Sequence, residues 1–384
     1  MSGIKKLHNP FVTTGYVSPD YFCDRENESK QILDAIQSHR SMALISLRRM
    51  GKTGLLKHVQ YLLKAQNKNN ELIYIDLMPT QSSADLLSML GTALLQLKSK
   101  EKNILAKILE TLSALRPGFS YDNLTGQPSV IFSVVTENDF HIGLRQLLAL
   151  FNTIKKELTI VLDEFQQILE YPEKNTEHLI RTIVQENPQI TFLFSGSNKH
   201  MMEAMFSSAT RPFYQSTELM YLGPIDTNSY SAFISNLFNA SRFDFNKDTI
   251  IYMLDWCRNH TFYVQHFCNR LFSKANHQKI DEIIVRQVSF EIIASFEPLY
   301  LTYRKLLTAP QFALIQAIAA ENGISKPLSG IFIQKYSLKS ASSVKTSLDA
   351  LESKELLINV NNTWLVYDVF FARWLEHNWK LLNL

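Results

Sequence analysis

Short, continuous apolar runs alternate with amphipathic stretches over the first 226 residues. The apolar runs lie at 42–47, 71–77, 158–165, 190–197 and 217–222. Continuous runs of this kind are typical of strands that are buried on both faces, as they are in parallel sheets. Apolar residues at helical spacing occupy 26–37, 84–98, 103–114, 139–156, 176–186 and 198–206. The alternation predicts an α/β fold, in which helices cover both faces of a parallel sheet.

The pattern changes twice further along the chain. The segment 116–137 contains Pro, Gly and Asn and is interpreted as an insertion or long loop with a short hairpin. From 227 to 306 the spacing is helical, with breaks near 242–246 and 276–279. We therefore divide the chain into a core domain (1–226), a helical lid domain (227–306) and a third domain (307–384).

The third domain has the pattern of a winged helix-turn-helix. The spacing predicts helices over 309–321, 327–336 and 340–353. These are followed by "LLINVNNTWLVYD", which predicts two short strands around Asn361 and Asn362.

Composition adds few constraints. The chain has 12 glycines among 384 residues, less than half the usual share of about 7%, which favours a helix-rich protein. A formal charge of +3 does not by itself indicate a nucleic-acid partner. Three cysteines without metal-ligand spacing, no secretion signal and no apolar run of membrane length predict free thiols in a cytoplasmic protein without membrane association.

The first apolar run leads into "SLRRMGKTG", which fits the phosphate-loop pattern G-x-x-x-x-G-K-[ST] except that Ser46 replaces the opening glycine. In this interpretation Lys52 contacts the β- and γ-phosphates of ATP, and the Thr53 hydroxyl ligates Mg²⁺. Backbone N–H groups of the loop surround the phosphates. The nucleotide-binding residues are then Ser46, Leu47, Arg48, Arg49, Met50, Gly51, Lys52, Thr53 and Gly54. The alternative is an ordinary strand–loop–helix that contains Gly-Lys-Thr by chance.

The run "LTIVLDEF" ends in an acidic pair. Carboxylates at the end of a buried strand are costly unless a cation or water uses them. In a nucleotide hydrolase, the first carboxylate orients Mg²⁺ and the second activates the attacking water. Asp163 is therefore the candidate metal ligand and Glu164 the candidate catalytic base, while a helix N-cap at Asp163 is the structural alternative.

The run "ITFLFSGS" ends with Ser197 and is followed by Asn198. A polar side chain here would lie beside the γ-phosphate, and Ser197 is the first candidate. A simple N-cap for the next helix is the competing interpretation.

These motifs, in this order, resemble the prokaryotic "archaeal-type" ATPases of the AAA+ and STAND branch of P-loop (ASCE) proteins, which are related to origin-recognition ATPases. The segment "YFCDRENESKQIL" is similar to a family box that usually lies near adenine, and in that comparison Arg25 binds the nucleotide. The segment "RNHTFYVQHFCNRL" is similar to the start of a lid-domain helix. The resemblance implies ATP and ADP as ligands, Mg²⁺ as the metal and ATPase activity.

Two departures from the family pattern affect the expected activity. Asn259 and Thr261 replace a glycine and a proline in the lid motif, and "RPFYQST" has Gln215 and Ser216 where the family has Gly-Arg. The missing arginine leaves Arg211 as the substitute for stabilising charge on the transferred phosphate. Because such arginines contribute several orders of magnitude in rate, we expect slow hydrolysis.

The predicted helix 340–353 would be the recognition helix of a DNA-binding winged helix, and it offers Ser340, Ser342, Ser343, Lys345 and Thr346 for phosphate contacts. Residues 301–384 contain nine Lys/Arg and six Asp/Glu, a small positive excess. Trp364, Trp374 and Trp379 are expected to be exposed or to pack against a neighbouring domain.

Three functions remain open: an ATP-driven conformational switch, a DNA-binding module with a structural ATP site, and a non-hydrolysing scaffold in a larger complex. The partner could be another protein, duplex DNA or a second copy of the chain.

Overall fold

A computed structural model of the chain describes residues 7–66, 69–97, 104–121, 126–134, 136–154, 156–275 and 279–382. The chain forms two compact units, and each is described here by itself. The sheet unit is Gly15–Pro224, and the helical unit combines the residues up to Thr14 with Ile225–Leu384. In the part of the chain that is described, no helix is both long and apolar enough to span a membrane.

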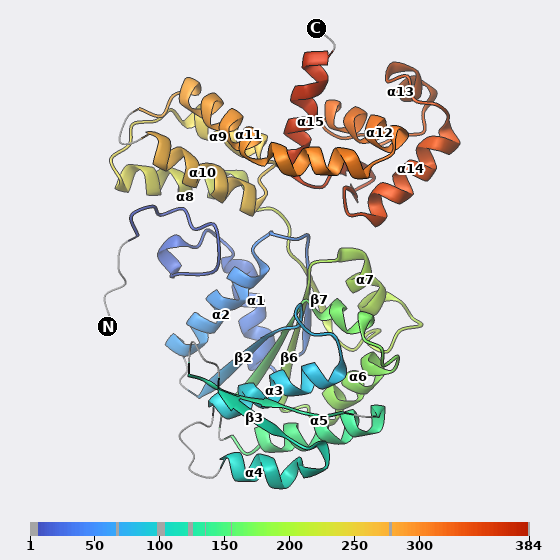
Figure 1. Cartoon of the computed structure of the whole chain (residues 1–384). Helices are drawn as coiled ribbons and strands as arrows, with labels where there is room; N and C mark the ends of the chain where they lie inside the picture. The colour runs from blue at the N-terminus through green and yellow to red at the C-terminus, as the bar shows by residue number, and fades with distance from the viewer. Residues whose placement is uncertain are drawn as a thin grey trace. The chain divides into compact units, whose positions relative to one another are not determined.

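The sheet unit is built on a five-stranded, all-parallel sheet with the strand order β2-β5-β6-β1-β7 (Figure 1). Its strands are β1 (Met42–Ile45), β2 (Asn70–Asp76), β5 (Glu157–Asp163), β6 (Ile190–Gly196) and β7 (Glu218–Tyr221). All five predicted strands are confirmed, with ends that differ by one or two residues. The order places β6 between β1 and β5, although β6 follows both in the sequence.

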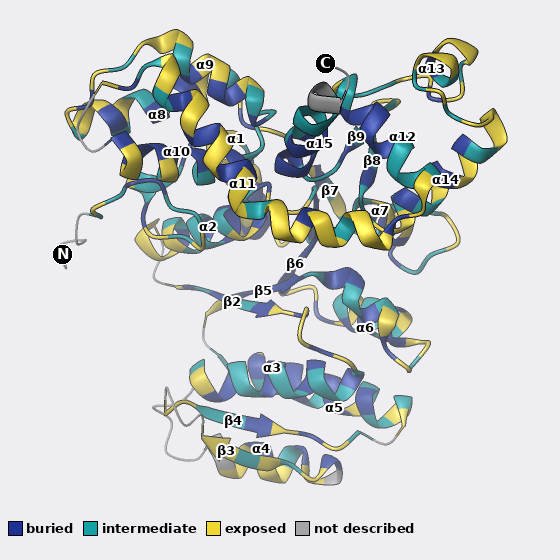
Figure 2. Ribbon diagram, turned by 45° about the horizontal axis from the view of Figure 1, so that its top comes forward, coloured by how far each residue is buried: buried dark blue, intermediate teal, exposed yellow. Residues whose placement is uncertain are grey.

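Helices cover both faces of this sheet (Figure 1). They are α1 (Glu26–Gln37), α2 (Lys52–Gln66), α3 (Ser83–Leu97), α5 (Glu137–Phe151), α6 (Thr176–Glu186) and α7 (Lys199–Ser207). The unit also contains α4 (Ile104–Thr111), which lies beyond α3 and α5 (Figure 2), and the 3₁₀ turns η1 (Pro19–Tyr21), η2 (Ser113–Leu115) and η3 (Phe165–Glu170). Successive strand residues point to opposite faces. Met42 and Leu44 therefore pack with α1 and α2, whereas Ala43 and Ile45 join the core on the other face.

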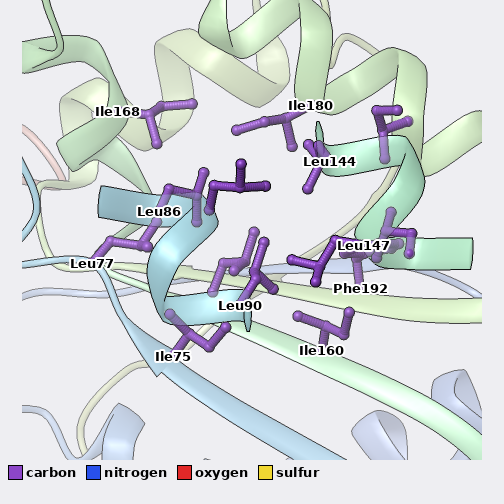
Figure 3. Packing of buried hydrophobic residues seen from close by; sticks show 14 of the residues in the cluster. Ile75, Leu77, Leu86, Leu90, Leu144, Leu147, Ile160, Ile168, Ile180 and Phe192 are labelled. Carbon is purple, nitrogen blue, oxygen red and sulfur yellow. The ribbon is translucent and has the colours of Figure 1, made fainter. Parts of the chain in front are cut away.

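The core on the second face is the larger of the two. It packs α3, α5, α6 and α7 against β2, β5 and β6, and Figure 3 shows how its aliphatic side chains meet. Leu86, Leu90, Leu147 and Ile160 are at most 4% exposed. Apolar burial on this scale is the main favourable contribution to folding of the sheet unit.

The segment 116–137 contains the expected hairpin, β3 (Gly118–Tyr121) paired with β4 (Pro128–Ile131). Residues 122–125 and 135 lie outside the described residues. The hairpin packs on α3 at Gly91, where an added Cβ would come within 2.6 Å of Phe132 and 2.7 Å of Val130. A glycine is therefore required at this contact.

The helical unit contains α8 (Thr227–Ala240), α9 (Lys247–Trp256), α10 (Thr261–Ala275) and α11 (Glu282–Leu306). The predicted break near 242–246 is confirmed, and 276–278 lie outside the described residues. A further break at 257–260 precedes α10, where the resemblance to the lid motif places a helix start. The hydrophobic spacing alone does not indicate it, because the segment has neither glycine nor proline. Arg258 and Asn259 instead adopt a φ of 52°.

The rest of the helical unit has the predicted winged-helix order. It contains α12 (Ala309–Ala320), α13 (Gly330–Lys335), α14 (Ala341–Ser353), β8 (Leu357–Val360), β9 (Thr363–Val366) and α15 (Val369–Leu382). Helix α13 starts later than predicted because the Ser329 hydroxyl accepts the Phe332 N–H and caps it. The division into three domains stays a prediction, since the second and third lie in one compact unit.

Trp374 is buried and not exposed, which agrees with the alternative expectation, since its partner Tyr300 lies in the predicted lid domain. The Trp374 side chain is 6% exposed and packs against Tyr300 and Phe371, with ring centroids 5.7 Å and 5.9 Å away. Trp364 and Trp379 are half-buried. The Trp379 ring packs against Tyr336, with centroids 5.3 Å apart, so Trp374 and Trp379 both pack within the helical unit. All three cysteines are free and buried.

Candidate functional site

Three loops follow the carboxyl ends of adjacent parallel strands and so meet at one edge of the sheet. Ile45 on β1 pairs in register with Gly196 on β6, and Leu162 on β5 pairs with Phe194 on β6. The loops after β1, β5 and β6 carry the candidate phosphate-binding, acidic and serine residues. Open α/β sheets commonly bind ligands at this edge.

The phosphate loop does not need a glycine at its first position. Ser46 is 4% exposed, has a negative φ, and donates a hydrogen bond from its Oγ to the Leu47 carbonyl at 2.8 Å. Gly51 has a φ of 96°, a conformation that favours glycine. Arg49, at 64°, lies in the left-handed region as well. The glycine that the backbone requires is therefore present.

Helix α2 begins at Lys52, whose side chain lies almost entirely inside the protein. Lys52 is 5% exposed. Burial lowers the pKa of its ammonium group, and the nearby carboxylates of Glu164 and Asp163 oppose that shift. A buried cation at a helix N-terminus is suited to an anionic ligand.

Asp163 is the acceptor for several donors. Its Oδ2 accepts hydrogen bonds from Thr53 Oγ1 at 3.1 Å and from the Tyr74 hydroxyl. Its Oδ1 accepts the Glu164 N–H at 3.0 Å. The candidate metal ligands Thr53 and Asp163 are therefore in direct contact, although they lie 110 residues apart in the sequence.

These two oxygen ligands fit Mg²⁺ as P-loop proteins hold it. Mg²⁺ is usually bound by one or two protein oxygens, with phosphates and water completing the octahedron.

Glu164 lies next to Asp163 and turns toward β6. Its backbone has a φ of 54°, and its Oε2 accepts hydrogen bonds from Ser197 Oγ and Gln166 Nε2, both at 2.6 Å. The structure thus brings the candidate base and Ser197 together. Asn198, rather than Ser197, caps α7 by accepting the Met201 N–H at 3.1 Å.

The structure also does not support the alternative in which Asp163 is the N-cap of the following helix. The turn that follows is η3, whose N-cap residue is Glu164, and this cap makes no side-chain hydrogen bond.

Arg25 is buried and held within the sheet unit. Its guanidinium donates to Glu28 Oε1 and to the Gly223 carbonyl, both at 2.6 Å. Phe22, three residues earlier, stacks on His58 of α2 with ring centroids 4.4 Å apart. These contacts tie the N-terminal box to the phosphate-loop helix and to the end of β7, while nucleotide binding by Arg25 stays a prediction.

Arg211 forms an ion pair with Glu177 on α6, with 2.5 Å between Nη2 and Oε2. Burial raises the pKa of the Glu177 carboxyl, and Arg211 opposes that shift. Ser216, which stands in place of the family's arginine, donates to the Phe213 carbonyl at 2.7 Å. The catalytic role of Arg211 stays a prediction.

Sequence reasoning missed Tyr74 and Gln166. Tyr74 lies on β2, which pairs with β5 so that Asp76 is opposite Asp163. Burial and the Asp163 carboxylate raise the pKa of the Tyr74 phenol, so the hydroxyl stays a donor. A tyrosine near the end of an apolar strand was the available signal, but it has meaning only once β2 and β5 are known to be neighbours.

Comparisons with known proteins agree with this architecture. Residues 298–377 match a family model described as a probable winged helix domain. A search of curated proteins finds no match. The Walker-type ATPase PABY2304 of Pyrococcus abyssi has a similar structure, with a TM-score of 0.65, 15% identity, and coverage of 95% of this chain and 99% of that one.

Two origin-recognition proteins of Aeropyrum pernix are also similar. The ORC2 protein, solved as ADPNP–ADP complexes, has a TM-score of 0.58 and 14% identity, with 97% of this chain and 96% of that one covered. The ORC1 protein, solved in complex with DNA, has a TM-score of 0.51 and 12% identity, with 95% of each chain covered.

The chain has the fold of a P-loop ATPase, with a helical region and a C-terminal winged helix. Its architecture is similar to that of the origin-recognition ATPases, as the sequence motifs predicted. Assignment to the STAND branch stays a prediction.

Proposed function

We propose that this chain binds ATP together with Mg²⁺ at the phosphate-loop edge of its sheet and hydrolyses it slowly. The observation that carries the proposal is the contact between Thr53 and Asp163. A Gly-Lys-Thr sequence that occurred by chance would not be expected to place its threonine hydroxyl against a buried carboxylate at the end of β5.

Each residue of the site has a distinct role in this proposal. Lys52 and the loop N–H groups bind the phosphates, while Thr53 and Asp163 hold Mg²⁺, which polarises the phosphate oxygens when it is bound. Glu164 accepts a proton from the attacking water. The hydrogen bond from Ser197 Oγ to Glu164 Oε2 fixes the direction of that carboxylate.

Slow turnover is the expected behaviour of the isolated chain. Ser216 cannot neutralise charge that develops on the γ-phosphate, and Arg211 is engaged with Glu177. Electrostatic stabilisation of that charge is commonly the largest single contribution to catalysis. We therefore expect a kcat below the range of about 1–10³ s⁻¹ that is typical of enzymes.

Calorimetric titration of ATP, with and without Mg²⁺, tests the binding part of the proposal. Lys52→Ala should abolish measurable binding, whereas Lys64→Ala, at an exposed position in the last turns of the same helix, should leave binding unchanged. Equal affinity in both variants would remove the phosphate-loop assignment.

Phosphate release tests the catalytic part of the proposal. Glu164→Gln should bind Mg-ATP and lose turnover, because an amide cannot accept the proton. Wild-type turnover in this variant would exclude Glu164 as the base.

In this proposal nucleotide occupancy controls the conformation of the helical unit, so that the chain works as a switch. The support is the architecture shared with the Pyrococcus abyssi ATPase and the nucleotide complexes of Aeropyrum pernix ORC2. A protease-protection pattern that is the same with ATP, with ADP and without nucleotide would contradict a switch.

Duplex DNA is the second candidate ligand, because the chain has a winged helix and the structurally similar ORC1 protein was solved with DNA. Helix α14, the predicted recognition helix, carries exposed positions (Figure 2). Ser342, Lys345 and Thr346 are among them, and the N-cap residue Ser340 is exposed as well. However, Lys345 pairs with Asp349 at 2.8 Å, which reduces the available positive charge. A binding constant for duplex DNA that falls steeply with salt, and that weakens in Lys345→Ala, would support this function.

A further inference from the structure

A cavity of about 400 Å³ lies in the sheet unit, away from the phosphate loop. It is lined by Arg40 and Ser41 just before β1, by Ile190 at the start of β6 and by Thr217 just before β7. These are the amino ends of the parallel strands, whereas the candidate nucleotide site is at their carboxyl ends. The cavity, called here the amino-edge cavity, is therefore a separate feature.

Two polar atoms in the wall of this cavity are buried without a hydrogen-bond partner among the described residues. They are Nε of Arg181, on α6, and Oγ1 of Thr217. Buried polar atoms are nearly always paired, and leaving one unpaired costs about 1–3 kcal/mol. Both atoms are almost completely buried, so neither can receive a ligand from the cavity. The terminal nitrogens of Arg181 are the donors that remain for one.

The charge of the amino-edge cavity favours an anion. Two arginines and one carboxylate line it, and Arg40 forms an ion pair with that carboxylate, Glu218. The Arg181 guanidinium forms no ion pair with any residue in the described ranges. A guanidinium presents a planar fork of donors that matches carboxylate and phosphate groups.

The lining also includes the apolar side chains of Val184, Ile190 and Phe213. The volume lies within the range of roughly 300–1,000 Å³ that is usual for small-molecule pockets.

We propose that the amino-edge cavity binds a small organic anion. Its carboxylate or phosphate group contacts the terminal nitrogens of the Arg181 guanidinium, and its apolar body packs against Phe213 and Ile190. This site is independent of the proposed ATPase activity.

The test uses the full chain without nucleotide. Benzoate and phenyl phosphate serve as anionic probes, and benzamide is the neutral probe of the same shape as benzoate. Calorimetric titration should show that at least one anion binds about tenfold or more tightly than benzamide. The stronger of the two anions identifies the preferred head group. Equal binding of all three probes, or binding of none, would overturn the proposal.

Variants locate the binding. Arg181→Gln should weaken the preferred anion about tenfold or more, whereas Arg181→Lys should retain part of the affinity because it keeps the charge. Lys64→Gln, on α2, is the matched control for the loss of one positive charge and should bind as the wild type does. Melting temperatures without ligand establish that each variant is folded. Undiminished binding in a folded Arg181→Gln variant would place the anion elsewhere and refute the site.

Discussion

Replacing Tyr74 with phenylalanine tests whether the contacts of Asp163 determine how the chain uses magnesium. The substitution removes one hydroxyl and keeps the ring, which packs under the Lys57 ammonium at 4.0 Å from the ring centroid. Asp163 Oδ2 then keeps the Thr53 donor alone, while Oδ1 keeps the Glu164 N–H. The carboxylate is no longer fixed from the β2 side.

The expected magnitude follows from the type of hydrogen bond that is lost. A hydrogen bond to a charged group contributes about 1.5–3 kcal/mol, and removing a partner of a metal ligand lowers metal affinity by about 10–100-fold. When the Thr53 hydroxyl turns to Mg²⁺, Tyr74 is the remaining side-chain donor to Oδ2 among the described residues. We therefore expect the Mg²⁺ concentration for half-maximal ATP binding to rise by at least about tenfold.

The assay is the binding of ATP, followed by calorimetry over a series of Mg²⁺ concentrations. Affinity without Mg²⁺ should be unchanged, because Tyr74 does not contact the phosphate loop in this proposal. Tyr61→Phe, on the exposed side of α2, is the matched control. An unchanged Mg²⁺ dependence in Tyr74→Phe would refute the role assigned to the hydroxyl, and an equal loss with and without Mg²⁺ would indicate a general disturbance of the site.

Three further substitutions test other parts of the structure. Gly51→Ala places a side chain at a φ of 96° and should cost about 1 kcal/mol or more in a urea titration, together with weaker ATP binding; wild-type values for both would contradict the loop conformation. Lys52→Met removes a buried ammonium whose pKa is lowered, chiefly by burial. Because the unfolded chain binds this proton more tightly, the wild type should gain stability as the pH rises from the folded-state pKa toward the ordinary value. The nucleotide-free variant should therefore melt above the wild type at pH 7, by a margin that shrinks toward pH 10, and a lower melting temperature at pH 7 would show that the lysine stabilises the empty site. Trp374→Ala removes a nearly buried ring and should destabilise the helical unit by about 3–5 kcal/mol, so a loss below about 1 kcal/mol in denaturant unfolding would show that the ring is not part of its core.

The order of elements could be predicted from the sequence because each element carries its own local signal. Buried strands appear as apolar runs, so β5 and β6 were recognised directly, and helical spacing identified α1 and α6 with the observed ends. The break at 257–260 has no such signal, since Arg258 and Asn259 occupy the left-handed region in place of glycine. Tertiary contacts stabilise it: the Arg258 guanidinium donates to Asn322 Oδ1 at 2.9 Å and to the Val366 carbonyl at 3.0 Å.

In the candidate site, too, the residues with a local sequence motif could be predicted, whereas their partners from other strands could not. Lys52, Thr53, Asp163 and Glu164 could be assigned from motifs, because each motif combines a strand end with a residue type that phosphate or metal binding requires. The partners that orient them could not be assigned, because they depend on strand order. Strand β6 lies between β1 and β5, which is why Ser197 reaches Glu164. Likewise, β2 lies beside β5, which is why Tyr74 reaches Asp163. Since the motif residues supply the chemistry and their neighbours supply the orientation, variants of Tyr74 and Ser197 should change magnesium dependence and turnover more than they change ATP affinity. Variants of Lys52 should do the reverse.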